Sequence, residues 1–84
     1  MLWEVAGLRV SESRGVVISE VSSDSRGARI GLAQGDTIVG VNGNPVASTD
    51  QLNDELKKSA ERSSIVLDVA RGRYIYSLTF PMAL

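Results

Sequence analysis

The segment 31–43, GLAQGDTIVGVNG, constrains the fold of this chain more than any other stretch of the sequence. Glycines stand where the backbone must turn, and the β-branched residues of 37–41 between them have the composition of a buried strand. Asn42 and Gly43 follow directly, and an Asn-Gly pair suits a type I′ turn because both of its central residues need positive φ. The segment therefore predicts a loop, a strand and a tight hairpin turn in close succession.

Five further segments have the composition of strands, but periodicity alone does not give their pairing. The return strand after the Asn-Gly turn contains a proline and is expected at a sheet edge, where a missing N–H does no harm. We expect a polar turn at 11–14. The strand segments are 8–10, 15–21, a short return strand beginning at Pro45 and Val46, and a final hairpin of 65–70 and 74–80 around 71–73.

Two helices are expected between these strands. The first is about one turn over Arg26–Ile30, with Ala28 and Ile30 facing inward, and Gly31 ends it. The second begins after Ser48, because Gln51 stands three residues later in a capping-box pattern. It runs to about residue 59 and presents one apolar stripe, made of Leu52, Leu56 and Ala60.

Composition excludes several classes of function. With 43% hydrophobic and 23% charged residues the 84-residue chain is an ordinary globular sequence, long enough for a single domain. Its net charge is −1 and its cations are scattered, so we expect no nucleic-acid partner. It has no cysteine and no histidine, so thiolate chemistry, zinc-thiolate sites and a Ser-His-Asp triad are excluded within it. No apolar run approaches the length of a membrane span, and we expect neither a cofactor nor a bound metal.

The remaining candidates for catalysis are weak. A Ser-Lys dyad using Lys57 or Lys58 is conceivable, but both lysines are expected on the polar side of a surface helix, where nothing would lower their pKa. Asp36 is expected to accept backbone hydrogen bonds before its strand and not to act in catalysis. Most of the dispersed arginines are expected to be solvated, out of the set Arg9, Arg14, Arg26, Arg29, Arg71 and Arg73. We therefore predict that the chain is not an enzyme.

The pattern as a whole resembles the PDZ domain family. The residues that carry the likeness are Ala6-Gly7-Leu8, GVVISEV at 15–21, Ala28 with Gly31-Leu32, Gly35-Asp36 with Ile38, Val41-Asn42-Gly43 and the closing strand pair. The order is similar to the circularly permuted bacterial form, and most similar to the C-terminal PDZ domain of Do-type (HtrA/Deg) envelope serine proteases. The resemblance implies an α+β fold, in which a strongly twisted antiparallel sheet or partial barrel of five to six strands is capped by two helices.

The resemblance also implies a peptide-binding site. Val5, Ala6, Gly7 and Leu8 correspond to the carboxylate-binding loop, whose backbone N–H groups would bind a peptide's terminal carboxylate. The peptide would add antiparallel to the strand that follows. Arg9 and Val10 lie on that strand, and Arg9 could meet an acidic ligand side chain. Ala6, Leu8 and Leu56 would line the pocket for the last peptide residue, while Thr49 and Asn53 would face residues further upstream.

Residues 1–84 are accordingly expected to form a single PDZ domain, excised from a larger protein. Its implied function is the capture of hydrophobic C-termini or extended segments of other proteins by strand addition, as an accessory domain of a periplasmic serine protease. The alternative is an assembly module that docks against a protease domain or a sister subunit and leaves the groove unused. Direct membrane insertion is not expected under either hypothesis.

Overall fold

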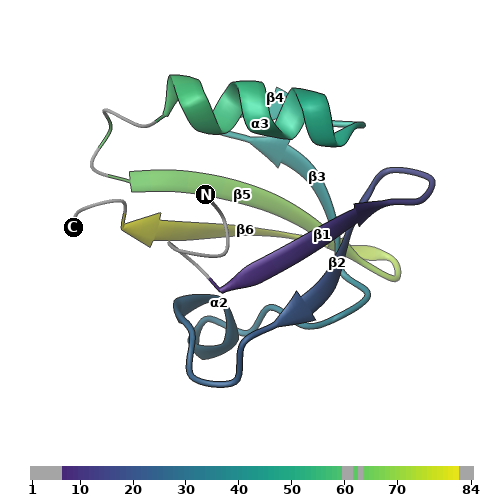
Figure 1. The fold of residues 1–84 in the computed structure, drawn as a ribbon, viewed down its shortest axis with the longest axis vertical. Coiled ribbons are helices and arrows are strands. Elements are labelled where there is room, and N and C mark those ends of the chain that lie inside the picture. The colour runs from purple at the N-terminus through teal and green to yellow at the C-terminus, as the bar shows by residue number, and fades with distance from the viewer. Residues whose placement is uncertain (1–6, 60–61, 63, 82–84) are drawn as a thin grey trace.

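The computed structural model describes residues 7–59, 62 and 64–81, and in this part of the chain one antiparallel sheet of six strands carries two helices (Figure 1). The first half of the chain forms β1 (Leu8–Glu12), β2 (Val16–Val21), α2 (Arg26–Arg29) and β3 (Thr37–Val41). The second half forms β4 (Asn44–Pro45), α3 (Thr49–Lys58), β5 (Ser64–Arg71) and β6 (Tyr74–Pro81).

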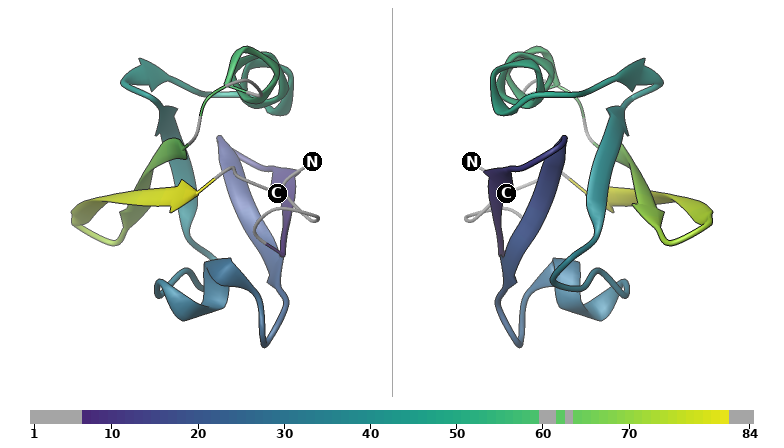
Figure 2. Two further views of the ribbon diagram at one scale, coloured as in Figure 1. Left: turned by 90° about the vertical axis from the view of Figure 1, so that its left-hand side faces the viewer. Right: turned by 90° about the vertical axis from the view of Figure 1, so that its right-hand side faces the viewer.

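The strands follow the order β1-β2-β3-β5-β6, and β4 pairs with β3. The sheet is strongly twisted, so that the β1–β2 and β5–β6 hairpins face each other across the core while α3 and α2 lie at its opposite ends (Figure 2). This arrangement confirms the predicted α+β fold. The buried apolar side chains form one cluster, made of Leu8, Val16, Ile18, Leu32, Ile38, Val41, Val46, Leu52, Leu56, Ile65, Leu67, Val69 and Phe80.

The strand predictions are correct in position and differ at their ends. β3 has the predicted bounds, and β5 and β6 are slightly longer than predicted. The turn predicted to begin at Ser11 was placed too early, because Ser11 and Glu12 continue β1 by pairing with Val17 and Val16. The reversal occurs at Arg14 and Gly15, which both have positive φ. Cross-strand pairing thus overrides the polar composition of these residues.

The first helix, α2, buries other residues than those predicted. Ser25 caps α2 by accepting a hydrogen bond from Ala28 N at 3.1 Å, and Ile30 is its C-cap. Gly27 is the buried residue, Ala28 is half-buried, and Ile30 is 36% exposed. The prediction that Ile30 faces inward was therefore wrong. A helix of four residues turns only about once, so few of its positions can face the core.

The Asn42-Gly43 turn was predicted correctly and also connects three elements. Both residues have positive φ, 51° and 85°. The Asn42 side chain accepts a hydrogen bond from Val66 N on β5 at 2.9 Å and donates one to Ser59 Oγ, at the end of α3, at 2.6 Å. These bonds tie the turn to the adjacent strand and to the C-terminal end of the longer helix.

The longer helix, α3, begins at the predicted cap. Ser48 Oγ accepts a hydrogen bond from Gln51 N at 3.1 Å, and Leu52 and Leu56 are buried. The side chain of Gln51 accepts from Ala47 N instead of from Ser48 N, so only half of the predicted capping box forms. Ala60, the last residue of the predicted stripe, lies outside the described residues.

Asp36 and Arg71 form an ion pair beneath the loop before β3. Asp36 is 3% exposed, and its carboxylate accepts from Ala33 N and from two nitrogens of Arg71, Nε at 2.8 Å and Nη2 at 2.7 Å. Arg71 Nη2 also donates to Gly31 O at 2.6 Å. The structural role predicted for Asp36 is confirmed, while its pairing with Arg71, whose side chain is still 48% exposed, was not predicted. The hydrogen bonds from Arg71 lower the pKa of Asp36, and burial opposes them only in part.

Gly7 is needed for a close approach between the start of β1 and the loop after β2. Its φ is +72°, its carbonyl accepts from Ser22 N at 2.8 Å, and a Cβ at this position would overlap the Ser25 side chain. A side chain at position 7 would therefore both strain the backbone and displace this loop.

We expect Asp36→Asn to lower the free energy of unfolding by about 2 kcal/mol at pH 7, because it weakens charge-assisted hydrogen bonds to a buried group. Folding lowers the pKa of Asp36, so its ionised carboxylate stabilises the fold fully above the pKa of an unfolded aspartate, about 3.9. This stabilisation is lost as pH falls through the lower pKa of the folded state. Urea denaturation at several pH values measures both effects. The exposed Asp24→Asn is the matched control, and a deficit for Asp36→Asn that does not shrink in acid would contradict the assignment.

We expect Gly7→Ala to cost about 3 kcal/mol of stability, since it combines positive-φ strain with overlap against Ser25. Gly72→Ala is the control, because Gly72 has φ +59° but open space around its Cα, and about 1 kcal/mol of strain is expected there. Equal losses of unfolding free energy in the two variants would show that the contact with Ser25 is unimportant.

Candidate functional site

β1 is an edge strand of the sheet in the described structure, and its neighbour away from β2 is the helix α3. We call the surface formed by these two elements the β1–α3 face. β1 and α3 are far apart in the sequence, and the fold of the sheet brings them together (Figure 1). An edge strand carries backbone N–H and C=O groups without a ladder partner, so this face can pair with another extended chain.

The predicted site residues are distributed over this face in different environments. Leu8 and Leu56 are both 2% exposed and belong to the same core cluster. Val10 packs against that cluster, while Asn53 is exposed and Thr49 is half-buried. Val5 and Ala6, two residues of the expected carboxylate-binding loop, lie outside the described residues.

Arg9 is exposed on β1 and lies beside Glu20 of β2. Its Nε is 3.4 Å from Glu20 Oε1, and each side chain is more than half exposed. An ion pair between exposed groups contributes little stability. The acidic side chain that Arg9 meets in this structure is therefore one from its own chain.

Glu12, a residue that the sequence gave no reason to select, bridges the β1–α3 face. Its Oε1 accepts hydrogen bonds from Thr49 N at 2.8 Å and from Thr49 Oγ1 at 3.1 Å. Thr49 is the first residue of α3, so the carboxylate binds a backbone N–H that has no partner within the helix, at the positive end of the helix dipole. These hydrogen bonds, the backbone one first, lower the pKa of Glu12. We call this contact the Glu12–Thr49 bridge.

Glu12 could not have been found from the pattern, because the bridge joins residues 37 positions apart. It also alters the environment of Thr49, which was expected to face a ligand. The hydroxyl and the backbone N–H of Thr49 are both engaged by Glu12.

The lysines of α3 and the acidic residues were the remaining candidates for a catalytic or metal site. Lys57 and Lys58 are exposed on α3, as predicted, and Lys58 Nζ lies 3.5 Å from Glu55 Oε1. No three acidic residues in the described part of the chain gather where they could hold a metal ion. Neither described helix is long and apolar enough to cross a membrane.

Solved structures share this architecture. A PDZ domain of EpsC from Vibrio cholerae superposes with a TM-score of 0.75 over 96% of this chain and 98% of that one, at 20% identity. The HtrA3 PDZ domain bound to a phage-derived ligand, FGRWV, superposes with a TM-score of 0.68 over 94% and 81% of the two chains, at 28% identity.

Sequence comparison points to serine proteases that contain such a domain. The chain is 38% identical over 61 residues to the periplasmic serine endoprotease DegP of Salmonella typhimurium, and 38% identical over 60 residues to the serine protease HTRA3 of Mus musculus. These matches cover 73% and 71% of this chain but only 12% of each relative. The family model of the PDZ domain matches residues 17–71, which run from β2 to the end of β5. The chain therefore belongs to the PDZ domain family and resembles the PDZ domains of HtrA and DegP serine proteases.

Proposed function

We propose that this PDZ domain captures extended peptides with apolar C-termini by adding them as a strand to β1. The observation that carries the proposal is the position of β1, an edge strand whose open side faces α3. Main-chain hydrogen bonds to an edge strand provide affinity without demanding much of the peptide sequence. The family, and a relative whose solved structure holds a peptide, support the same function.

The direction of the backbone groups supports a ligand at the start of β1. Gly7 O accepts a hydrogen bond from Ser22 N, so this carbonyl faces away from the open edge. Because successive residues of a strand direct their peptide groups to opposite sides, the groups of Leu8 are directed toward a ligand. In the proposal Val5, Ala6, Gly7 and Leu8 bind the terminal carboxylate, and Arg9 and Val10 continue the pairing.

The proposed apolar pocket requires a small rearrangement. Leu8 and Leu56 belong to the core cluster and are almost fully buried, so a peptide's last side chain is admitted only if one or both of them shift. Moving these buried side chains costs free energy that is subtracted from binding. We therefore expect an affinity of about micromolar strength for a short peptide.

The relatives support a wider context for the domain. We propose that it is a non-catalytic accessory domain, residues 1–84, of an envelope serine protease in the periplasm. The chain itself carries no protease domain, and its likeness to a periplasmic endoprotease is the basis of this proposal. Docking on a protease domain or a sister subunit is the second candidate function, favoured by the buried Leu8 and Leu56 and by the Glu12–Thr49 bridge.

A peptide titration separates these two functions. We expect the tetrapeptide acetyl-Ala-Ala-Val-Val to shift the backbone amide signals of Gly7, Leu8 and Arg9 in NMR spectra of the labelled domain. Its C-terminal amide should bind at least about tenfold more weakly, because the carboxylate contributes charge-assisted hydrogen bonds. If neither form shifts these signals at millimolar concentration, the assembly function is favoured instead.

The Glu12–Thr49 bridge predicts a limit on peptide length. A peptide paired with Leu8–Ser11 extends about 13 Å before it reaches the bridge, at about 3.3 Å per residue. We expect Glu12→Ala to increase the affinity for an octapeptide severalfold relative to a tetrapeptide with the same C-terminus, because the bridge no longer closes the upstream end.

Calorimetric titration of both peptides measures this difference. Glu20→Ala is the control, since it removes the same charge from an exposed site on the neighbouring strand. A similar length preference in Glu12→Ala, Glu20→Ala and the unaltered domain would rule out the bridge as a determinant of peptide length.

A further inference from the structure

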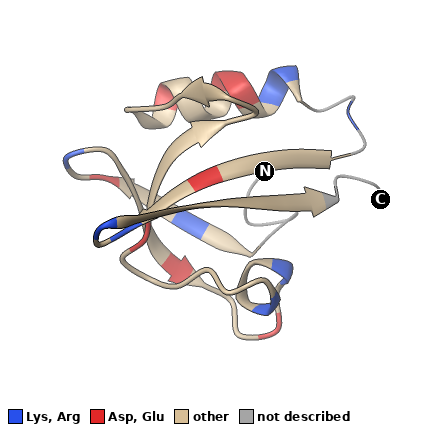
Figure 3. Ribbon diagram, turned by 180° about the vertical axis from the view of Figure 1, so that it is seen from behind, with Lys and Arg blue, Asp and Glu red and all other residues tan. Residues whose placement is uncertain are grey.

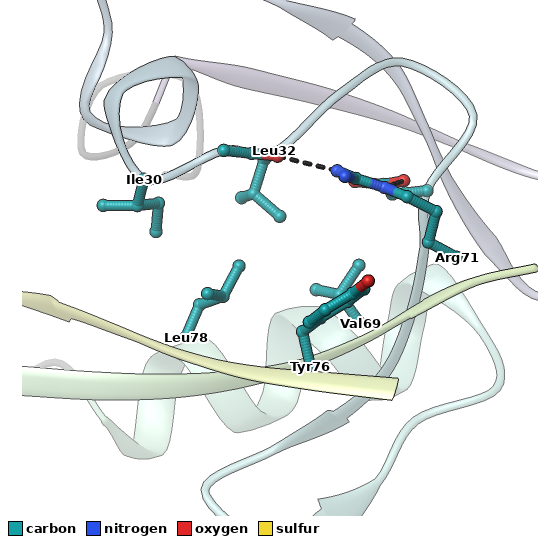
Figure 4. A pocket seen from close by; sticks show the side chains of 8 residues that line it. Ile30, Leu32, Val69, Arg71, Tyr76 and Leu78 are labelled. Carbon is teal, nitrogen blue, oxygen red and sulfur yellow. Dashed lines mark hydrogen bonds and ion pairs between the residues drawn. The ribbon is translucent and has the colours of Figure 1, made fainter. Parts of the chain in front are cut away.

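A second surface suited to binding lies on the other side of the molecule, between the loop after α2 and the β5–β6 hairpin (Figure 4). This pocket has a volume of about 190 Å³. Its walls come from two regions that are distant in sequence: Ile30, Gly31, Leu32 and Asp36 from the loop, and Val69, Arg71, Tyr76 and Leu78 from the hairpin. None of these residues belongs to the β1–α3 face.

The pocket exists because the inner face of the sheet extends beyond the core. Alternate residues of β6 share a face, and along it Phe80 is buried, Leu78 is half-buried, Tyr76 is 43% exposed and Tyr74 is 67% exposed. α2 has only four residues, and Ile30 at its end is 36% exposed at the rim of the pocket. Apolar side chains on both walls therefore remain uncovered by the chain itself in the described structure.

The size and lining of the pocket define one kind of occupant. Sites for drug-sized ligands usually measure about 300–1,000 Å³, so this pocket is suited to a single side chain. Leu32, Val69 and Leu78 line an apolar floor, and Arg71 stands over the Tyr76 ring at 5.7 Å from its centre. Arg71 is fixed by Asp36 and Gly31 through Nε and Nη2, which leaves Nη1 without a hydrogen bond in the described structure.

Basic positions adjoin the two elements that form the walls of the pocket. Asp36, the acidic residue in its wall, is already bound to Arg71. Arg29 precedes Ile30 on one side, and Arg73 lies in the β5–β6 turn on the other, and both are exposed. Lys and Arg positions mark α2 and this turn in Figure 3. Cations that flank an apolar pocket attract a segment whose large apolar side chain has acidic neighbours.

We propose that this pocket is a second docking site, which takes one aromatic or aliphatic side chain from an acidic segment of a partner protein. The apolar side chain enters between Ile30 and Tyr76, and flanking carboxylates lie near Arg29, Arg71 and Arg73. Unlike the site on β1, this one requires no free C-terminus. A partner can therefore bind here while a peptide occupies β1.

The test uses the peptide acetyl-Glu-Asp-Phe-Asp-Glu amide, whose blocked end cannot enter a carboxylate loop. We expect saturable NMR shifts at Ile30, Gly31, Leu32 and Tyr76, with no change at Leu8–Glu12. Ile30→Glu should weaken binding at least about tenfold, because it places a carboxylate at the rim. Ile75→Glu is the control, because Ile75 is 69% exposed on the opposite face of β6. The affinity of this variant for the peptide should stay within about twofold of that of the unaltered domain.

The contribution of charge is tested separately. The Arg73→Glu domain should bind the acidic peptide at least about tenfold more weakly than the unaltered domain does. The unaltered domain should bind the basic peptide acetyl-Lys-Lys-Phe-Lys-Lys amide at least about tenfold more weakly than the acidic one. Equal binding of the acidic and basic peptides would overturn the proposal. NMR shifts confined to β1 and α3, or equal losses of affinity for Ile30→Glu and Ile75→Glu, would also overturn it. So would sedimentation data in which Ile30→Glu abolishes a dimer, because the occupant would then be a second copy of this chain.

Discussion

The hydrogen bonds of the Asn42 side chain fix the geometry on which the proposed peptide site depends. One amide group links the β3–β4 turn to β5 through Val66 and to the end of α3 through Ser59. Asn44 adds a second link to α3, because its Nδ2 donates to the Glu55 carboxylate at 3.0 Å. α3 is thereby held over the open end of the sheet, where its other end reaches β1. Rigid placement of α3 lowers the entropy lost when a ligand orders the site.

The two faces of the domain differ in how completely the chain covers them. At the β1–α3 face, Leu8 and Leu56 complete the core and Glu12 caps α3. A ligand side chain that enters beside Leu8 and Leu56, or a peptide that extends past Glu12, competes with interactions already made. At the pocket beside β6 the opposite holds, because the apolar face continues past the last covering residue, Ile30. This contrast leads us to propose strand addition at the first face and side-chain insertion at the second.

Local patterns predicted the elements well and their tertiary contacts poorly. The bounds of β3, the positive-φ turn and the Ser48 cap were all readable, because each depends on residues close together in sequence. Arg71 and Glu12 were not, since their partners lie 35 and 37 positions away. Of the proposed peptide site, the sequence placed Leu56 on the apolar stripe of its helix but did not predict that Leu8 is buried in the same core. That burial depends on how the sheet folds over α3.

What the sequence by itself determined is the set of strands and helices, the lack of histidine and cysteine and the resemblance to the PDZ family. These follow from short-range backbone preferences and from residue types such as the missing histidine and cysteine. Only the tertiary structure decided that β1 and β6 lie at the two ends of the sheet, which charged residues pair and where an apolar face stays uncovered. Those features depend on contacts between distant segments, and their geometry is set by packing the whole sheet around one core.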